Sequence, residues 1–141
     1  MPVNDLARSD VVTATEETSV SELAGTMADE MVGSVVIVDD ETPVGIVTDR
    51  DLALRCVAEE GETGEMTANN VMTEDLETIE RDAGFYEAVE LMRDNGIRRL
   101  PVTDGDELVG ILTADDLTTL LADEQQGLSD VIEAQRPPYD E

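Results

Sequence analysis

Two stretches of the chain, GIVTDRDL at 45–52 and GILTADDL at 110–117, are nearly identical and lie 65 residues apart. The same offset pairs further identical residues: Thr13 with Thr78, Met27 with Met92, Asp29 with Asp94, Asp39 with Asp104, and Thr48 with Thr113. The chain is therefore two copies of one unit, at roughly 9–60 and 74–123. Two copies are too few for a solenoid. They fit a pseudo-two-fold pair in which each copy buries a face against the other.

Each copy has the pattern β-α-β-β-α. A short extended piece precedes an amphipathic helix, whose apolar residues recur at helical spacing. Ser19 or Thr18 is a candidate N-cap of the first such helix, and Asn95-Gly96 closes its equivalent. Two strands follow, and a second helix begins at Thr48 or Thr113. The sequence predicts an α/β (α+β) fold of two repeats packed through their sheets. The expected strands are 11–14, 34–40 and 43–48, then 76–79, 99–105 and 107–113.

The same pattern predicts the domain boundaries. Residues 1–60 form the first repeat, and 74–123 form the second. The segment 61–73 is a linker, because 61–70 is rich in Gly, Asn and Thr. In the tail 124–141 we expect one or two turns of helix at 127–135, ended by Arg136-Pro137-Pro138.

The charge balance excludes several classes of partner. The chain has 35 acidic residues and 8 basic ones, all Arg, for a net charge of −27. Such a surface repels nucleic acid and anionic lipid. The acidic, Lys-free composition resembles that of cytoplasmic proteins of haloarchaea. In molar salt the screening length falls to ~3 Å, so repulsion among the acidic residues is weak. No apolar run approaches the ~20 residues of a membrane span, and the N-terminus has no signal pattern. We expect a cytoplasmic protein.

The chain lacks several of the residue types on which most catalytic mechanisms depend. The chain has no His or Lys, so no Ser-His-Asp triad or other nucleophile–base pair can be assigned. Zinc has almost no ligands, because Cys56 is the one cysteine. Its apolar surroundings predict a buried core thiol. We expect no catalytic residues, no metal site and no enzyme activity.

The repeated T-x-x-D motif has two interpretations. Thr48 and Thr113 can be plain helix N-caps, with Asp51 and Asp116 completing a capping box, although Glu or Gln is usual there. The same geometry puts a hydroxyl and a carboxylate at a helix N-terminus, ready for a ribose diol and a phosphate. The preceding glycines, Gly45 and Gly110, fit either a structural bulge or close approach of a ligand.

The repeat, the GIVTDRD and GILTADD stretches, and NGIRRLPV at 95–102 together resemble a tandem pair of cystathionine-β-synthase-type (CBS) domains, a Bateman module, over about 9–123. The resemblance implies that Asp51 and Asp116 bind ribose, and that Thr48 and Thr113 bind phosphate or ribose. It also implies that backbone around the first extended piece and the second strand contacts adenine. Around the first extended piece these positions are Val12, Thr13, Ala14, Glu77, Thr78 and Ile79. The segments before the second strand that line the same pocket are Gly33, Ser34 and Val35, and Arg98, Arg99, Leu100 and Pro101.

The two implied clefts differ in charge. Arg98 and Arg99 fall where family members contact phosphate, whereas the first copy has Gly33 and Ser34. An ordinary surface ion pair is the alternative role for this arginine pair. We expect Thr113, Asp116, Arg98 and Arg99 to form the better site. Thr48 and Asp51 form a weaker one, and Arg50 is a further candidate near the central cleft.

The resemblance implies a sensory module that binds AMP, ADP, ATP or S-adenosylmethionine and acts on an unknown effector protein. Asp115, beside Asp116, disfavours ATP relative to AMP and favours the cationic S-adenosylmethionine, although Mg²⁺ carried by the nucleotide would offset the repulsion. Apolar helix stripes predict a homodimer. The alternative is a protein-interaction module whose clefts have lost their ligand.

Overall fold

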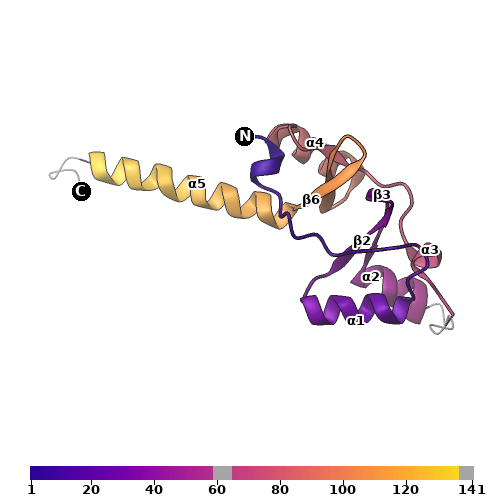
Figure 1. Cartoon of the computed structure of the whole chain (residues 1–141). Coiled ribbons are helices and arrows are strands. Elements are labelled where there is room, and N and C mark those ends of the chain that lie inside the picture. The colour runs from indigo at the N-terminus through magenta and orange to yellow at the C-terminus, as the bar shows by residue number, and fades with distance from the viewer. Residues whose placement is uncertain (59–64, 137–141) are drawn as a thin grey trace.

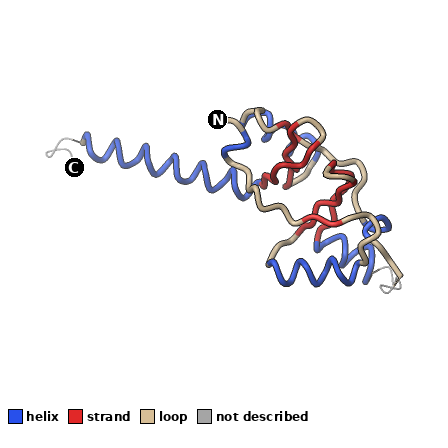
Figure 2. The backbone as a smooth tube through the Cα atoms, viewed as in Figure 1, coloured by secondary structure: helices blue, strands red, loops and turns tan. Residues whose placement is uncertain are grey.

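The computed structural model describes residues 1–58 and 65–136, and it contains two similar β-α-β-β-α units (Figures 1 and 2). The predicted fold class is confirmed. The first unit contains β1 (Thr13–Ala14), α1 (Val20–Glu30), β2 (Ser34–Asp39), β3 (Thr42–Thr48), α2 (Asp49–Leu52) and the π-helical segment η2 (Ala53–Val57). The second contains β4 (Ile79–Glu80), α4 (Phe85–Asn95), β5 (Arg99–Asp104), β6 (Glu107–Thr113) and α5 (Ala114–Gln135).

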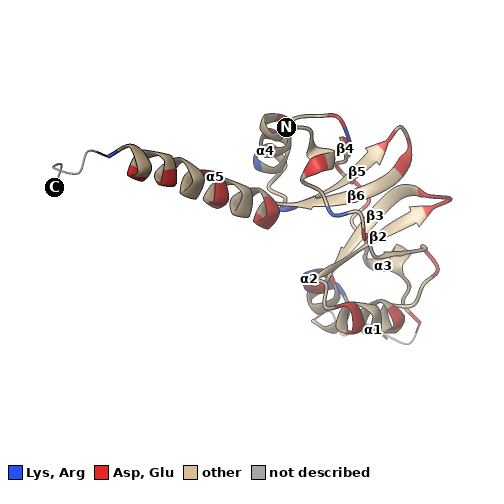
Figure 3. Cartoon of the chain, turned by 60° about the vertical axis from the view of Figure 1, so that its left-hand side comes forward, with Lys and Arg blue, Asp and Glu red and all other residues tan. Residues whose placement is uncertain are grey.

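Each unit builds a three-stranded sheet, β1-β2-β3 or β4-β5-β6, in which the first pair of strands is parallel and the second antiparallel. The two sheets meet at β3 and β6 (Figure 3). The N–H of Leu108 donates to the carbonyl of Glu41 at 2.9 Å and joins the two hairpins. Each sheet and its helices enclose an aliphatic core, which excludes water from apolar side chains and stabilises the unit.

The helix ends follow the expected capping chemistry. The hydroxyl of Ser19 accepts the N–H of Glu22 at 3.1 Å and caps α1, as predicted. Gly96 ends α4 in the left-handed conformation, with φ of 62°. At the equivalent end of α1 the left-handed residue is Met31, with φ of 56°. Cys56 is buried in the first core, as its apolar surroundings predict.

Two short helical turns each pack into the core of the other unit. The sequence patterns did not predict either turn or this crossing. The turn η1 (Val3–Asp5) brings Val3 into the second core, while α3 (Ala68–Val71) packs into the first. These turns are themselves 65 residues apart. Each is followed by a bridge to the last strand of the unit against which it packs: Arg8 to Ile111 in β6, and Thr73 to Ile46 in β3. Residues 68–71, expected within the linker, are therefore helical, and residues 61–64 lie outside the described part of the chain.

The crossing segments explain Gly45 and Gly110. A Cβ on Gly45 would lie 2.7 Å from the sulfur of Met72 and 3.0 Å from the carbonyl oxygen of Thr73. A Cβ on Gly110 would lie 3.0 Å from the carbonyl oxygen of Arg8. Each glycine also pairs beside a break in strand register. The structural interpretation of these glycines accounts for them, because the crossing backbone needs the space.

The tail differs from its prediction. Residues 127–135 are not a separate turn or two of helix, but continue α5 without a break from Ala114 to Gln135. In the first unit the corresponding α-helix is short, because α2 changes to the wider π-helical hydrogen-bonding at Ala53. Helix α5 therefore projects well beyond the fold (Figure 1).

Candidate functional site

Both T-x-x-D motifs form capping boxes at a strand-to-helix junction. In the first, the hydroxyl of Thr48 accepts the N–H of Asp51 at 3.1 Å, and Asp51 Oδ2 accepts the N–H of Thr48 at 3.0 Å. The equivalent distances for Thr113 and Asp116 are 3.1 and 3.2 Å. Each aspartate thus uses one oxygen for the cap and has a second oxygen for another partner.

The second oxygens have different surroundings. Asp116 Oδ1 accepts from Arg8 Nη2 at 3.1 Å and Nε at 3.3 Å, so the N-terminal crossing segment already occupies it. Asp51 Oδ1 lies 3.9 Å from Arg55 Nε, beyond hydrogen-bond distance. Asp51 is therefore the more available acceptor of the two.

A first cleft opens between the units around Thr48 and Asp51. It has a volume of about 240 Å³. The end of β3 and the start of α2 form one wall, and the corner before β5 supplies Ile97, Arg98 and Arg99 from the other unit. The remaining lining residues are Ile46, Asp49, Arg50 and Thr73.

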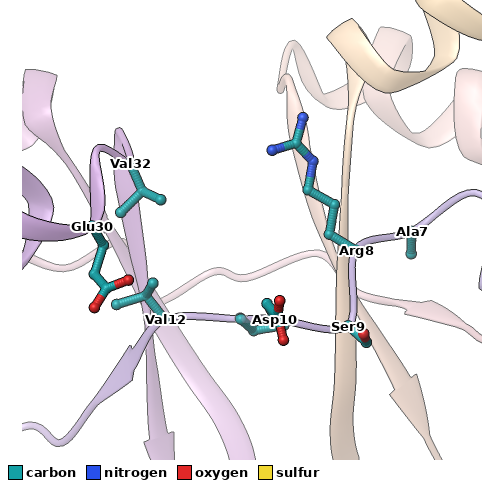
Figure 4. A pocket seen from close by; sticks show the side chains of 8 residues that line it. Ala7, Arg8, Ser9, Asp10, Val12, Glu30 and Val32 are labelled. Carbon is teal, nitrogen blue, oxygen red and sulfur yellow. The ribbon is translucent and has the colours of Figure 1, made fainter.

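A second cleft of about 220 Å³ lies at the pseudo-symmetric position around Thr113. Its other wall comes from the first unit, at Val11 and Val12 and at the corner Met31–Ser34. The rest of its lining comprises Arg8, Asp10, Arg99, Ile111 and Asp115. A wider cavity adjoins it along residues 7–12, where Figure 4 shows Arg8 on one side and Val12 and Val32 on the other.

Two arginines in the first cleft make no ion pair with any residue that the structure describes. Six of the eight arginines lie within 4.0 Å of a carboxylate: Arg8, Arg55, Arg81, Arg93, Arg98 and Arg136. The other two, Arg50 and Arg99, both line the first cleft. In a chain with 35 acidic residues, two guanidinium groups without an ion pair among the described residues make this cleft a candidate site for an anion.

The structure places Arg98 and Arg99 in a different cleft from the one that the sequence predicts. The sequence grouped Arg98 and Arg99 with Thr113 and Asp116. Both instead line the first cleft, with Thr48 and Asp51, and only Arg99 also reaches the second. The reason is that residues 98–99, at the start of β5, face the first unit across the cleft. Arg98 does form the expected kind of surface pair, with Asp115 at 3.0 Å.

Of the positions predicted around adenine, Val12, Gly33 and Ser34 line the second cleft, but the following line neither cleft: Thr13, Ala14, Val35, Thr78, Ile79, Leu100 and Pro101. Thr13 and Ala14 form β1, and Thr78 and Ile79 line a separate pocket at the outer edge of the second sheet. The other three side chains are buried in the sheets: Val35, Leu100 and Pro101. Val11, next to the predicted Val12, also lines the second cleft just before β1. The sequence did not indicate Arg8, because its position beside Asp116 depends on the crossing of the N-terminal segment to the second unit.

Within residues 1–58 and 65–136, no group of metal-ligating side chains is close enough to hold an ion. Across that same part of the chain, no helix is both long enough and apolar enough to cross a membrane.

Comparisons with known proteins agree with this architecture. The model of the CBS domain matches residues 3–57 and 68–123. Protein YlbB of Bacillus subtilis is 40% identical over 118 residues, covering 82% of this chain and 79% of that protein. Protein MK0525 of Methanopyrus kandleri is also 40% identical, over 82% of this chain, but the match spans only 60% of that relative's length.

Solved structures of similar fold contain adenosine compounds. The CBS domain pair of protein MJ0100, in complex with 5′-methylthioadenosine and S-adenosylmethionine, has a TM-score of 0.79 at 26% identity, covering 88% of this chain and 98% of that one. Protein PAE2072 of Pyrobaculum aerophilum, complexed with AMP, has a TM-score of 0.75 at 28% identity, covering 82% and 89%. The chain belongs to the CBS-domain family and consists of a tandem CBS pair with a long C-terminal helix.

Proposed function

We propose that this protein is a non-catalytic regulatory module that binds an adenosine-containing ligand in the first cleft and signals to a partner protein. The observation that carries the proposal is the coincidence of three groups there. Arg50 and Arg99 have no carboxylate partner among the described residues, and Asp51 has an oxygen that is not hydrogen-bonded. The similar CBS pairs crystallised with AMP or S-adenosylmethionine support this class of ligand.

The chemistry of the cleft fits the three parts of such a ligand. Asp51 Oδ1 can accept both hydroxyls of a ribose diol. The hydroxyl of Thr48 accepts the helix N–H and keeps its own proton to donate to a phosphate, beside Arg50 and Arg99, which bind phosphate bidentately. Ile46 and Ile97 supply an apolar contact for a purine.

The size and charge of the first cleft favour a small nucleotide. Its 240 Å³ is below the ~300–1,000 Å³ of typical ligand pockets, so a nucleoside would fill it. A single phosphate meets two arginines without an ion pair among the described residues, whereas additional phosphates approach Asp49, which lines the same cleft. We therefore rank AMP above ADP and ATP. Mg²⁺ bound to ATP would reduce that difference.

Calorimetric titration tests this proposal. AMP, ADP, ATP with and without Mg²⁺, and S-adenosylmethionine are titrated in 0.15 M and 2 M KCl, because a charge of −27 repels anions most at low salt. Asp51→Asn still provides a side-chain oxygen to accept the N–H of Thr48 but removes the negative charge offered to the ribose. It should weaken AMP binding about tenfold, equivalent to about 1.4 kcal/mol.

The matched control is Asp116→Asn, which makes the same change in the second cleft and should alter AMP affinity less than twofold. If Asp116→Asn weakens binding and Asp51→Asn does not, the second cleft is the site, as the sequence grouping implied. If none of the ligands produces heat with folded protein, the nucleotide function is wrong.

In that last case the second candidate, a ligand-free interaction module, gains support. One observation favours it for the second unit: Asp116 is ion-paired with Arg8 from within the chain and is not among the described residues that line the second cleft.

A further inference from the structure

The C-terminal part of α5 is a long helix with nothing packed against it. Leu117 is the last buried residue of α5, and residues 121–136 are all exposed. Figures 1 and 2 show this part extending away from both CBS units. Four large apolar side chains on it are more than half exposed, namely Leu121, Leu128, Val131 and Ile132.

These apolar residues share one face. At 100° per residue, Leu117, Leu121, Leu128 and Ile132 fall within about 60° of one another, with Val131 beside them. This set, with the buried Leu117 at its base, is the apolar stripe of α5. A stripe of this width is the kind that a core or a partner covers, and the units of this chain cover only its first residue.

The helix is also poorly stabilised on its own. An isolated helix of about 15 residues is marginal in water, and Gly127 costs about 1 kcal/mol more. The chain has no Lys for i,i+4 pairs with the acids of α5. Its one internal ion pair among the described residues, Arg136 with Glu133, lies at the very end. Asp130 and Glu133 oppose the helix dipole near the C-terminus. Contact along the stripe would supply the missing stabilisation.

We propose that the apolar stripe of α5 is a self-association surface, covered by α5 of a second copy of this chain. The argument for a second copy is the placement of charge. Five of the six carboxylates of the helix lie on the opposite side, at Asp115, Asp116, Asp123, Asp130 and Glu133; Figure 3 shows acidic residues along α5. Only Glu124 falls within the stripe. Two copies can therefore meet here with little repulsion, although the net charge of each is −27.

The same charges favour an antiparallel pair. A parallel pair would hold the two acidic CBS units of the dimer side by side. An antiparallel pair places these units at opposite ends of a helix about 33 Å long. The stripe is short compared with a standard interface of ~800 Å² per partner, so the dimer should dissociate on dilution and strengthen with KCl.

Sedimentation velocity of the full chain over a range of protein concentrations, in 0.15 M and 2 M KCl, tests the proposal. The wild type should be a concentration-dependent dimer that is stronger in 2 M KCl. Leu128→Asp, which puts a charge in the stripe, should weaken dimerisation at least tenfold. The control is Thr119→Asp, which adds the same charge to the opposite side of the same helix and should leave the dimer within twofold.

Circular dichroism checks that both variants keep the CBS fold. Three results would overturn the proposal: a wild type that stays monomeric at every concentration, a Leu128→Asp variant that dimerises as before, or equal weakening by Thr119→Asp. The second result would move the interface to another exposed apolar patch, such as Leu54 and Val57. This inference does not depend on the nucleotide proposal, because no ligand is added in the experiment.

Discussion

In the second CBS unit the capping carboxylate Asp116 is held by Arg8, whereas in the first unit Asp51 keeps an oxygen for a partner from outside. The backbones around them are alike, with the same capping box and the same strand-to-helix junction. The difference comes from the crossing segments: position 8 is Arg and its counterpart at position 73 is Thr. The crossing residue at position 8 is therefore one source of the chemical difference between the two clefts.

The comparison also separates the structural from the functional parts of the repeated motif. Gly45 and Gly110 admit a crossing backbone in both units, and both threonines cap a helix. These roles are complete without a ligand. The two clefts differ in Arg50, which lines only the first and has Asp115 as its counterpart 65 residues away, whereas Arg99 lines both clefts.

The largest effect that we expect on stability comes from filling the two glycine positions. Gly45→Ala puts a methyl group 2.7 Å from the sulfur of Met72 inside the first core, and Gly110→Ala puts one 3.0 Å from the carbonyl oxygen of Arg8. Overpacking typically costs about 1–3 kcal/mol, and we expect Gly45→Ala nearer the upper end. Urea unfolding in 2 M KCl measures both.

The control for these glycines is Gly25→Ala. Gly25 lies within α1 and nothing is within 4 Å of its added Cβ, so this variant should gain about 0.5–1 kcal/mol. Equal and small effects at Gly45 and Gly110 would show that the crossing segments are loosely held, and the structural explanation of the repeat would fail.

The sequence could predict the fold because its signals are local and occur twice. Helical periodicity, the Ser19 cap and the Gly96 stop each specify their element without reference to distant residues. The crossing of η1 and α3 could not be seen in the same way, because these turns are short and pack against the other unit. The sequence did not predict the full length of α5, because the segment from Gly127 onward was expected to be a separate short helix. The helix instead continues through Gly127.

The candidate site was predicted in part. The T-x-x-D positions and the importance of the arginines came from the repeat and the family resemblance. The family resemblance grouped Arg98 and Arg99 with Asp116 of the same repeat, whereas the clefts of this structure are formed between the repeats, from the residues around the second strand of one unit and the helix start of the other. Ion pairing of Arg8 depends on a crossing path that no local pattern encodes.

A smaller effect on stability is expected where the helix ends differ. Met31 is 91% exposed and holds a left-handed φ of 56°, which costs a non-glycine residue about 1 kcal/mol or more. Met31→Gly should therefore stabilise the first unit by about 1 kcal/mol. Gly96→Ala should destabilise the second by a similar amount, because its φ is 62°.

Chemical unfolding of both variants measures this pair of opposite effects. Effects of the same sign would mean that the C-terminal ends of α1 and α4 are not equivalent. The pseudo-symmetry would then not include these helix ends.

The smallest effect on stability is expected from Arg8→Gln, and it bears most directly on the unequal clefts. The Arg8 side chain is 69% exposed, so its ion pair with Asp116 contributes about 0.2–1 kcal/mol. Removing it frees Asp116 Oδ1 and gives the second cleft the same open acceptor as the first. We expect unfolding to change little, while calorimetry with S-adenosylmethionine, the cationic ligand that suits Asp10 and Asp115, detects a binding event stronger than in the wild type. Arg81→Gln, which removes a comparably exposed ion pair with Asp104 away from both clefts, is the control. If Arg8→Gln and Arg81→Gln bind alike, Arg8 does not restrict the second cleft, and the inequality must arise from other lining residues, such as Arg50.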